Sequence, residues 1–196
     1  LEVLRQPLED GVVTIARAAA SITFPCRFML VAAMNPCPCG YYGDARRQCR
    51  CTTNQIHHYR NKISGPLLDR IDIHIEVAGI RYQDLAGLAK GDTSAAIRSH
   101  VMGARGRQHE RFKGRRRVHS NSDMGSKDIQ KHCSMSVEAQ DLLKAAMTGL
   151  HFSARAYDRI LKVSRTIADL EGVEAIGPSH VSEAIQYRTL DRQLWA

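Results

Sequence analysis

The pattern of hydrophobic and polar positions changes near residue 80 of this 196-residue chain. Before that point, residues 28–34 form an unbroken apolar run, which is typical of a strand buried on both faces of a parallel sheet. Residues 71–77 alternate apolar and polar side chains, and this period predicts a strand with one solvent-facing side. Two β-branched runs at 12–16 and 21–24 are separated by a short connection and predict a hairpin.

Beyond residue 80 the apolar positions recur at helical spacing, and the pattern indicates no further strand. We predict helices there over roughly 94–112, 136–148, 153–171 and 178–188. Two earlier helices are predicted, one ending at Asp10-Gly11 and one over 53–63. The fold class is therefore α/β plus all-α, with an α/β domain at 1–80 and a helical domain at 81–196.

The composition argues against a membrane-spanning or secreted protein, but it does not identify a binding partner. The net charge of +8 favours an anionic partner. The sequence has no apolar run of about 18 residues and no basic-then-apolar leader, so we expect no membrane-spanning helix and no secretory signal. Because the chain begins in a helical pattern without Met, we interpret it as part of a longer protein with a cytoplasmic location.

Four cysteines form two close pairs in a turn-rich loop over 36–51: Cys37, Cys39, Cys49 and Cys51. Thiolates in two pairs suit tetrahedral zinc, and we predict a structural Zn²⁺ site there. The single residue inside each pair is tighter than the usual spacing of about two to four. His57 or His58 as replacement ligands, reduced free thiols and disulfides therefore remain alternatives. Three arginines of the loop would offset the negative charge of the thiolates: Arg46, Arg47 and Arg50.

Two polar side chains adjoin the predicted sheet strands. Asn35 follows the first strand, at the kind of position where open α/β sheets bind ligands. Arg70 precedes the second, and we expect its guanidinium to point away from the sheet, where it would suit a phosphate. The alternatives are that Asn35 caps a turn before Pro36 and that Arg70 pairs at the surface with Asp69 or Asp72.

A third candidate lies in the helical domain. Ser153 is a natural N-cap, which places Arg155 in the first turn of a helix. A cation there opposes the helix dipole, and a bound anion would relieve the conflict. Arg155, Arg159 and Lys162 share one face, and the alternative is an ordinary solvated face.

The segment 98–117 is strongly basic. Its cations are Arg98, Arg105, Arg107, Arg111, Lys113, Arg115, Arg116 and Arg117, and its only acid is Glu110. Such a segment favours contact with a nucleic-acid backbone. A solvated face and linker is the alternative, because Phe112 stands alone and aromatic residues are not interleaved with the cations to stack on bases.

Three stretches together resemble the magnesium-chelatase-like AAA+ ATPases of the ComM/YifB type. They are LRQPLEDGVVTIAR at 4–17, AAMNPCPCG at 32–40 and GPLLDRIDIH at 65–74. The resemblance covers essentially the whole chain. It implies the C-terminal half of an AAA+ core followed by a helical lid, with the first half of the core and a Lon-protease-like domain upstream.

The resemblance also assigns roles. It implies that Asn35 is sensor 1, which orients the attacking water, and that Arg70 is an arginine finger offered to a neighbouring subunit's ATP. Arg155 matches the sensor 2 arginine, which reaches the phosphates. The hairpin at 12–27, with Arg17, matches a hairpin that faces the ring pore and contacts nucleic acid in related helicases. Arg115, Arg116 and Arg117 are further candidates for nucleic-acid contact.

The implied activity is that of a ring, expected to be a hexamer, which uses ATP and Mg²⁺ to drive DNA translocation or branch migration. The sequence contains no G-x-x-x-x-G-K-[S/T] motif and no apolar run ending in paired acids. We therefore predict that this chain alone does not hydrolyse ATP. Two alternatives stay open: a chelatase-type motor that remodels a protein partner for metal insertion, and a zinc-stabilised DNA-binding module without ATP chemistry.

Overall fold

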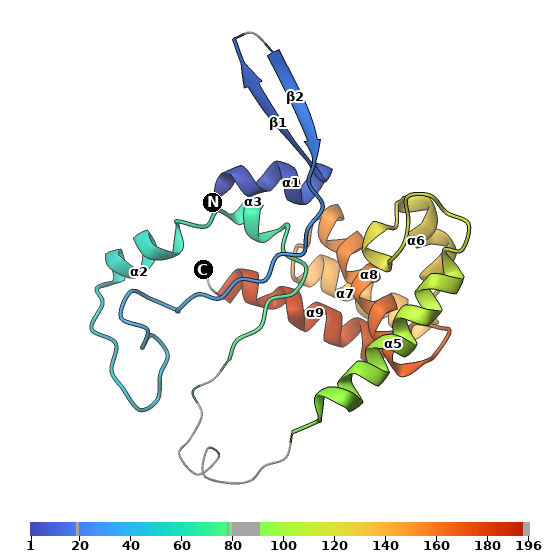
Figure 1. Cartoon of the computed structure of the whole chain (residues 1–196). Helices are drawn as coiled ribbons and strands as arrows, with labels where there is room; N and C mark the ends of the chain where they lie inside the picture. Colours follow the sequence, from blue (N-terminus) through green and yellow to red (C-terminus); the bar gives the residue numbers. More distant parts are fainter. Residues whose placement is uncertain (19, 78, 80–90, 194–196) are drawn as a thin grey trace. The chain divides into compact units, whose positions relative to one another are not determined.

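The computed structural model describes residues 1–18, 20–77, 79 and 91–193, and its helices and strands carry the labels of Figure 1. The chain divides into two compact units: the first comprises Leu1–Gly79 and Leu190–Ala196, and the second comprises Ile80–Thr189. Each unit is described by itself. Among the described residues, no helix is both long enough and apolar enough to span a bilayer.

In its described residues, the first unit contains a short 3-10 turn, three helices and one hairpin. These are η1 (Glu2–Leu4), α1 (Arg5–Asp10), β1 (Val12–Arg17), β2 (Ala20–Pro25), α2 (Thr53–Arg60) and α3 (Gly65–Leu68). Helix α1 ends at Gly11, whose left-handed backbone (φ 65°) lets its N–H donate to Pro7 O. The predicted stop at Asp10-Gly11 is therefore confirmed.

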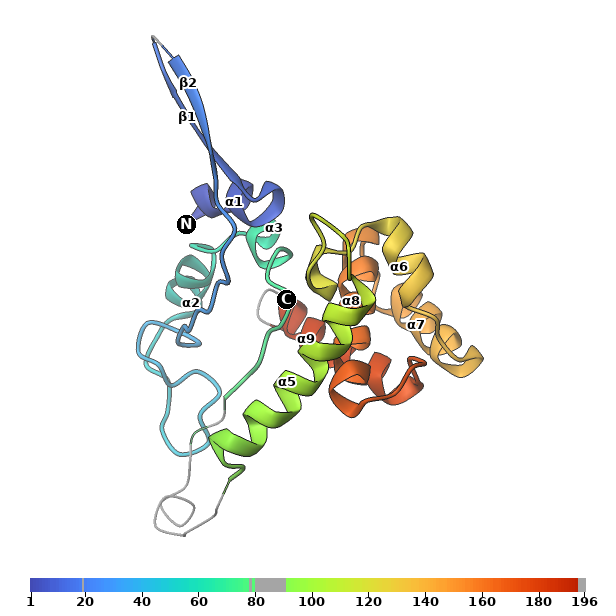
Figure 2. The same ribbon diagram turned by 45° about the vertical axis from the view of Figure 1, so that its right-hand side comes forward.

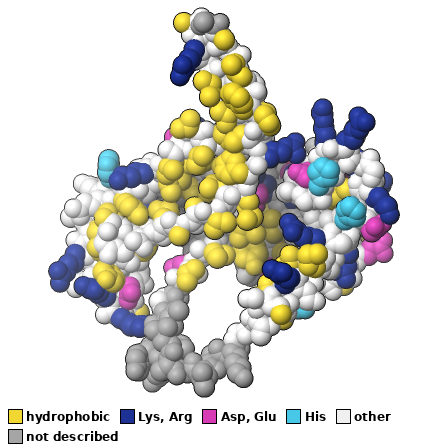
Figure 3. Space-filling view, in the orientation of Figure 1, with side chains coloured by type: hydrophobic (Ala, Val, Ile, Leu, Met, Phe, Trp, Pro, Cys, Tyr) yellow, Lys and Arg dark blue, Asp and Glu magenta, His cyan; other side chains and the backbone are white. Residues whose placement is uncertain are grey.

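The predicted hairpin is confirmed as an antiparallel pair in which Ile15 faces Ile22. On the opposite side of the ribbon, Thr14 and Thr23 share a hydroxyl hydrogen bond of 3.0 Å. Ile15, Ile22 and Phe24 are each about half exposed, so one face of the ribbon is apolar and open. Figures 1 and 2 show the hairpin extending beyond the rest of its unit, and Figure 3 shows the apolar side chains along it.

The two predicted sheet strands are wrong for this structure. Residues 28–34 and 71–77, as far as they are described, belong to no strand, and the sheet of the described chain has two strands, β1 and β2. Most of their apolar side chains are exposed, with Met29 at 87% and Val77 at 80%, whereas Leu30 and Ile71 are partly buried. A strand forms only when a neighbour accepts and donates its backbone hydrogen bonds. An apolar run does not supply that neighbour.

The second unit is helical. It is built from α5 (Ser94–Arg111), η2 (Asn121–Asp123), α6 (Ser126–His132), α7 (Val137–Gly149), α8 (Ala154–Glu171) and α9 (Pro178–Gln193). The four helices predicted for this part are confirmed within a few residues of their ends, except that α9 runs on to Gln193. Helix α6 was missed because its seven residues are too few for a helical period to stand out.

A single hydrophobic core holds this unit together. Fifteen side chains from its helices and connections form the core, among them Leu143 at 2% exposure and Ile160 and Val181 at 0%. Ser153 caps α8 by accepting from Ala156 N at 3.1 Å, as predicted.

A buried carboxylate, Asp169, ties α8 to α5 and η2. Arg111 binds it with both guanidinium nitrogens, at 2.6 and 2.5 Å, and Asn121 Nδ2 donates to it at 2.8 Å. Arg165 Nε donates to it at 3.2 Å, and Arg165 Nη2 donates to Val173 O at 2.6 Å. Burial alone would raise the pKa of Asp169, but the bonds from Arg111 and Asn121 outweigh it and hold that pKa below its usual value.

Candidate metal and nucleotide sites

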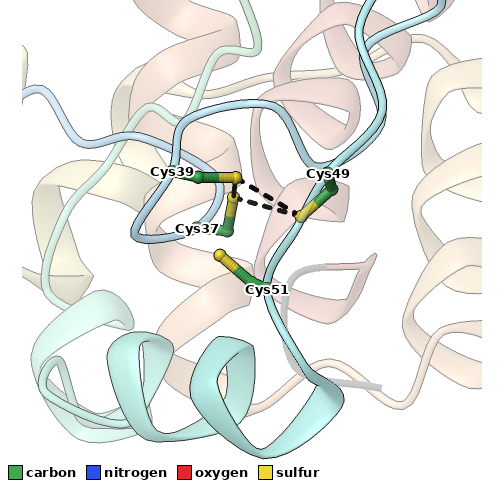
Figure 4. A group of neighbouring side chains, drawn as sticks. All are labelled: Cys37, Cys39, Cys49 and Cys51. Atoms are coloured by element: carbon green, nitrogen blue, oxygen red, sulfur yellow. Dashed lines mark hydrogen bonds between the residues drawn. The ribbon is translucent and has the colours of Figure 1, made fainter.

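The side chains of the four cysteines in the 36–51 loop point toward one another, although the two pairs lie on separate segments of the loop (Figure 4). Sγ of Cys37 lies 3.4 Å from Sγ of Cys39 and 3.7 Å from Sγ of Cys49, and the last two sulfurs are 3.5 Å apart. With Cys51 included, all four sulfurs lie within 4.8 Å of one another. All six cysteines of the chain are free, so the disulfide alternative is not realised.

This geometry fits a tetrahedral zinc ion. Thiolates at Zn–S bonds of about 2.3 Å lie about 3.8 Å from one another around such an ion. The three measured separations, 3.4 to 3.7 Å, are close to that value. Within the described residues, the group consists of the four cysteines, so His57 and His58 are not part of it.

The four thiols differ in acidity. Backbone N–H groups of Arg50 and Tyr41 donate to Cys39 and lower its pKa to about 6. Burial and the neighbouring thiols raise the pKa of Cys51 to about 12. Like charges at these separations repel, so a cation at the centre is what would allow all four groups to be thiolates at neutral pH.

Local structure explains why the cysteines meet. Gly40 and Gly43 have φ values of 83° and 82°, which favour glycine and let the loop reverse. Helix α2 begins directly after Cys51, and its N-cap Thr52 exchanges bonds with Gln55 in a capping box. Arg60, at the end of α2, donates from Nε to Pro36 O at 3.2 Å. The helix and the first cysteine pair are thus held together by one buried arginine.

Asn35 is exposed and lies against this loop. A side-chain carbon on Gly40 would come within 3.8 Å of Asn35 Cγ and Nδ2, so the amide rests on the turn between the cysteine pairs.

Arg70 does not point away freely, contrary to the expectation from the sequence. Its Nη1 donates to Pro66 O at 2.6 Å, and its Nη2 forms an ion pair with Glu9 of α1. The side chain is 13% exposed. Glu9 is a carboxylate 61 positions earlier in the chain, and sequence spacing does not reveal this partner.

A second contact joins the same two segments. Ser64, the N-cap of α3, donates its hydroxyl to Glu2 Oε2 at 2.9 Å and accepts from Arg5 Nη2 at 2.6 Å. The Ser64 hydroxyl lowers the pKa of Glu2. The first ten residues therefore form the support that orients the segment carrying Arg70.

Arg155 occupies the first turn of α8 and is exposed, as the sequence predicted. It belongs to the helical unit, whereas Asn35 and Arg70 belong to the first. On the same helix, Tyr157 is 37% exposed, whereas Ile160 and Leu161 are buried.

The candidate nucleic-acid residues fall into two groups. Arg17, at the end of β1, is exposed, as are Arg116 and Arg117. Arg115 is also exposed, but it binds both oxygens of Asp128, at 3.1 and 3.3 Å. In the same segment, Arg107 donates to the backbone O of Asp169 and Arg111 binds the Asp169 carboxylate, so part of the basic run stabilises the helical unit.

Comparison with known proteins assigns the class. The family model described as magnesium chelatase, subunit ChlI, matches residues 1–85, and the model for the C-terminal part of the same subunit matches residues 91–188. The chain therefore belongs to the magnesium-chelatase-like family, a family of AAA+ ATPases, and within it to the ComM/YifB type.

Individual relatives sharpen this assignment. The chain is 45% identical over 195 residues to the competence protein ComM of Haemophilus influenzae and 39% identical over 198 residues to YifB of Escherichia coli. A protein of Mycobacterium bovis, Mb2921c, is 32% identical over 188 residues. These matches cover 99%, 99% and 96% of this chain and 37% of each relative. The chain thus spans little more than a third of their length.

Proposed function

We propose that this chain is the part of a ring-forming AAA+ motor that completes the ATP site and contacts DNA. The observation that carries the proposal is the 45% identity to the competence protein ComM over 99% of this chain. That span includes Asn35, Arg70, the cysteine loop and Arg155. The competence role of the relative favours DNA as the substrate of the motor, moved by translocation or branch migration, in a cytoplasmic hexameric ring.

Asn35, Arg155 and Arg70 would each have a different role in ATP hydrolysis. Asn35 would orient the attacking water, and Arg155 would hold the phosphates of the same nucleotide. Arg70 of a neighbouring subunit would stabilise the charge that develops on the transferred phosphoryl group. Mg²⁺, when bound with ATP, would neutralise charge between the phosphates. The contacts of Arg70 with Glu9 and Pro66 O imply that it exchanges these partners for phosphate when the ring closes.

The cysteine loop has a structural part in this proposal. A zinc ion bound by its four thiolates would fix the loop against α2 and, through Gly40, would support Asn35. Zinc would thus stabilise the environment of the catalytic amide without taking part in the chemistry.

Subunit mixing of the full-length protein tests the assignment. Arg70→Ala and Asn35→Ala should each lower ATP turnover, the former by about 10³-fold or more, as expected for loss of an arginine finger. A mixture of the two variants should recover part of the activity. An Arg70→Ala subunit keeps its own Asn35 and can receive Arg70 from its Asn35→Ala neighbour. No recovery in rings shown to be mixed would contradict the role in trans.

The 196-residue chain by itself supplies the control for the missing motifs. It should hydrolyse no ATP above background, because it contains no phosphate-binding loop. Sustained turnover by the isolated chain would show that the site is built differently.

A chelatase-type motor is the second candidate, favoured by the family model for magnesium chelatase subunit ChlI. Both motors would use the same residues on ATP, so the substrate must separate them. Stimulation of ATP turnover by DNA, weakened by salt, favours the DNA motor. An assembled ring that ignores DNA favours a protein client.

A further inference from the structure

The cysteine loop carries aromatic and basic side chains on its outer surface. Between the two cysteine pairs lie Tyr41, Tyr42, Arg46 and Arg47, and Arg50 lies within the second pair. Tyr42 and the three arginines are exposed. Asp44 is the one acid of this stretch, and it accepts from the backbone N–H groups of Arg46 and Arg47 at 2.7 and 3.1 Å. These bonds fix the turn and lower the pKa of Asp44.

The ring of Tyr42 contacts a buried arginine on one side and solvent on the other. The guanidinium of Arg60 lies over its ring, 4.8 Å from the centroid. Arg60 is buried, whereas Tyr42 is 48% exposed, so the solvent-facing part of the ring is the part that Arg60 does not cover. The cation–π contact and the bond from Arg60 to Pro36 O fix the orientation of the ring relative to the cysteine cluster. A planar ligand can stack on it with little loss of side-chain freedom.

Tyr41 and Arg47 form a second pair beside it. The Arg47 guanidinium lies 4.2 Å from the Tyr41 ring centroid and donates to the Tyr41 hydroxyl at 2.7 Å. Arg46 Nη2 donates to Gly79 O at 3.0 Å. The loop therefore presents an ordered ring flanked by oriented cations, the combination that binds single-stranded nucleic acid through stacking and phosphate contacts.

We propose that the cysteine loop is a binding site for single-stranded DNA, in which a base stacks on Tyr42 and phosphates contact Arg46, Arg47 and Arg50. Single strands fit because a base must present its face to the tyrosine, and in a duplex that face is covered by its neighbours. This inference rests on the proposed function for its choice of DNA. It differs in assigning the strand contact to the metal-supported loop.

The charge of the loop predicts the character of the binding. A zinc–tetrathiolate centre is negative, and the three arginines approximately balance it. Long-range attraction is therefore small, and stacking contributes much of the affinity. In a plot of log K for binding against log salt concentration, the slope should be only about −2. Each of the three phosphate contacts contributes roughly −0.7 to this slope.

The test is fluorescence anisotropy of the zinc-loaded chain with a labelled single strand of about 20 thymidines, without nucleotide. Tyr42→Ala should weaken binding about tenfold, within a range of roughly 5- to 150-fold, and should leave the salt slope unchanged. Arg50→Ala should reduce the slope by about 0.7. Tyr42→Phe should bind as the parent does, and so should Tyr157→Ala, which removes a partly exposed tyrosine of the other unit.

The outcomes separate this inference from the proposed function. If the parent chain binds the strand but Tyr42→Ala binds equally well, the stacking site is overturned and the DNA motor stands. If duplex of the same length binds as tightly as the single strand, the stacking site is also overturned. If neither form of DNA binds, the DNA part of the proposed function fails with it.

A second measurement guards against a folding defect in the variant. Metal analysis should show the same zinc content in Tyr42→Ala as in the parent chain. Photo-cross-linking of a strand containing 5-iododeoxyuridine to the parent chain should place the adduct within 41–50. Adducts confined to the helical unit would overturn the proposal whatever the variant does.

Discussion

The two units of this chain stabilise themselves by different means. The helical unit buries a single core and an ionic network centred on Asp169. The first unit relies on a few polar links, such as Arg60 to Pro36 and Arg70 to Glu9, and on four convergent thiols. It leaves large apolar side chains such as Met29 and Val31 in solvent. We expect the helical unit to fold on its own contacts, and we expect the first unit to depend on a metal and on partners that cover its apolar surface.

Removing the metal should produce the largest difference between the two units in their protection from hydrogen exchange. Cys37→Ser, or chelation of the parent chain, should lose about one zinc per chain. Structural zinc contributes on the order of 10–16 kcal/mol of apparent binding free energy in small zinc peptides. Hydrogen exchange should then increase across 36–51 while α7 and α8 keep their protection.

Cys26→Ser is the matched control, because Cys26 lies outside the cluster and should leave the zinc content unchanged. A parent chain that contains no zinc when purified without chelators or metal resin would remove the metal from this comparison.

Asp169→Ala should be the most damaging single change in the helical unit. It leaves Arg165, 3% exposed, and Arg111, 15% exposed, without their shared carboxylate. Removing one partner of a buried ion pair costs about 3–5 kcal/mol. Urea unfolding followed by circular dichroism measures the loss.

Glu110→Ala supplies the comparison for that measurement. Glu110 pairs with Lys113 at the surface, where both side chains are about 70% exposed, so its loss should change stability by less than about 1 kcal/mol. Equal effects of the two substitutions would mean that the buried network adds nothing.

The same Met→Ala substitution, made once in each unit, compares the contribution of a buried apolar side chain with that of an exposed one. Met124→Ala removes a side chain that is 3% exposed from the helical core and should cost about 2–5 kcal/mol. Met29→Ala removes one that is 87% exposed and should change the free energy of unfolding by no more than about 0.5 kcal/mol. A large cost for Met29→Ala in the isolated chain would show that its segment packs in solution.

Acid should weaken the helical unit by a smaller, graded amount. Burial disfavours ionised Asp169, but Arg111 and Asn121 more than compensate, so its folded pKa lies below its unfolded value of about 3.9. The stabilisation is therefore complete above about pH 4 and is lost as the pH falls through the folded pKa. In urea titrations from pH 6 to pH 2, Asp169→Ala should lack much of this dependence. An unchanged pH profile in the variant would assign the effect to other carboxylates, such as Asp128, whose pKa is also lowered.

The parts of the fold that could be predicted are those specified by neighbours in sequence. The hairpin follows from β-branched runs, and α8 follows from Ser153 at one end and Gly172 at the other. Local sequence could not decide whether the two runs predicted as sheet strands, 28–34 and 71–77, form strands. Pairing requires a partner strand, and composition indicates burial only when something is present to cover the side chains.

The candidate site shows the same division. The cysteine spacing predicted a cluster, and the four sulfurs meet at distances that suit zinc. The pairing of Arg70 with Glu9 was not foreseen, because Glu9 lies 61 positions away and only the packing of α1 beside α3 brings the two together. Tyr42 was overlooked because the contact that makes it a platform comes from Arg60, on the following helix.

The sequence by itself determined the longer helices, the hairpin and the family, and it supplied the candidate residues for binding metal or phosphate. These depend on local periodicity, capping and motif spacing, which the order of residues specifies directly. Only the tertiary structure decided which acidic partners several of the arginines bind, namely Asp169, Asp128 and Glu9. Ionic partners are selected by proximity and desolvation, and both arise only when segments distant in the chain are packed together.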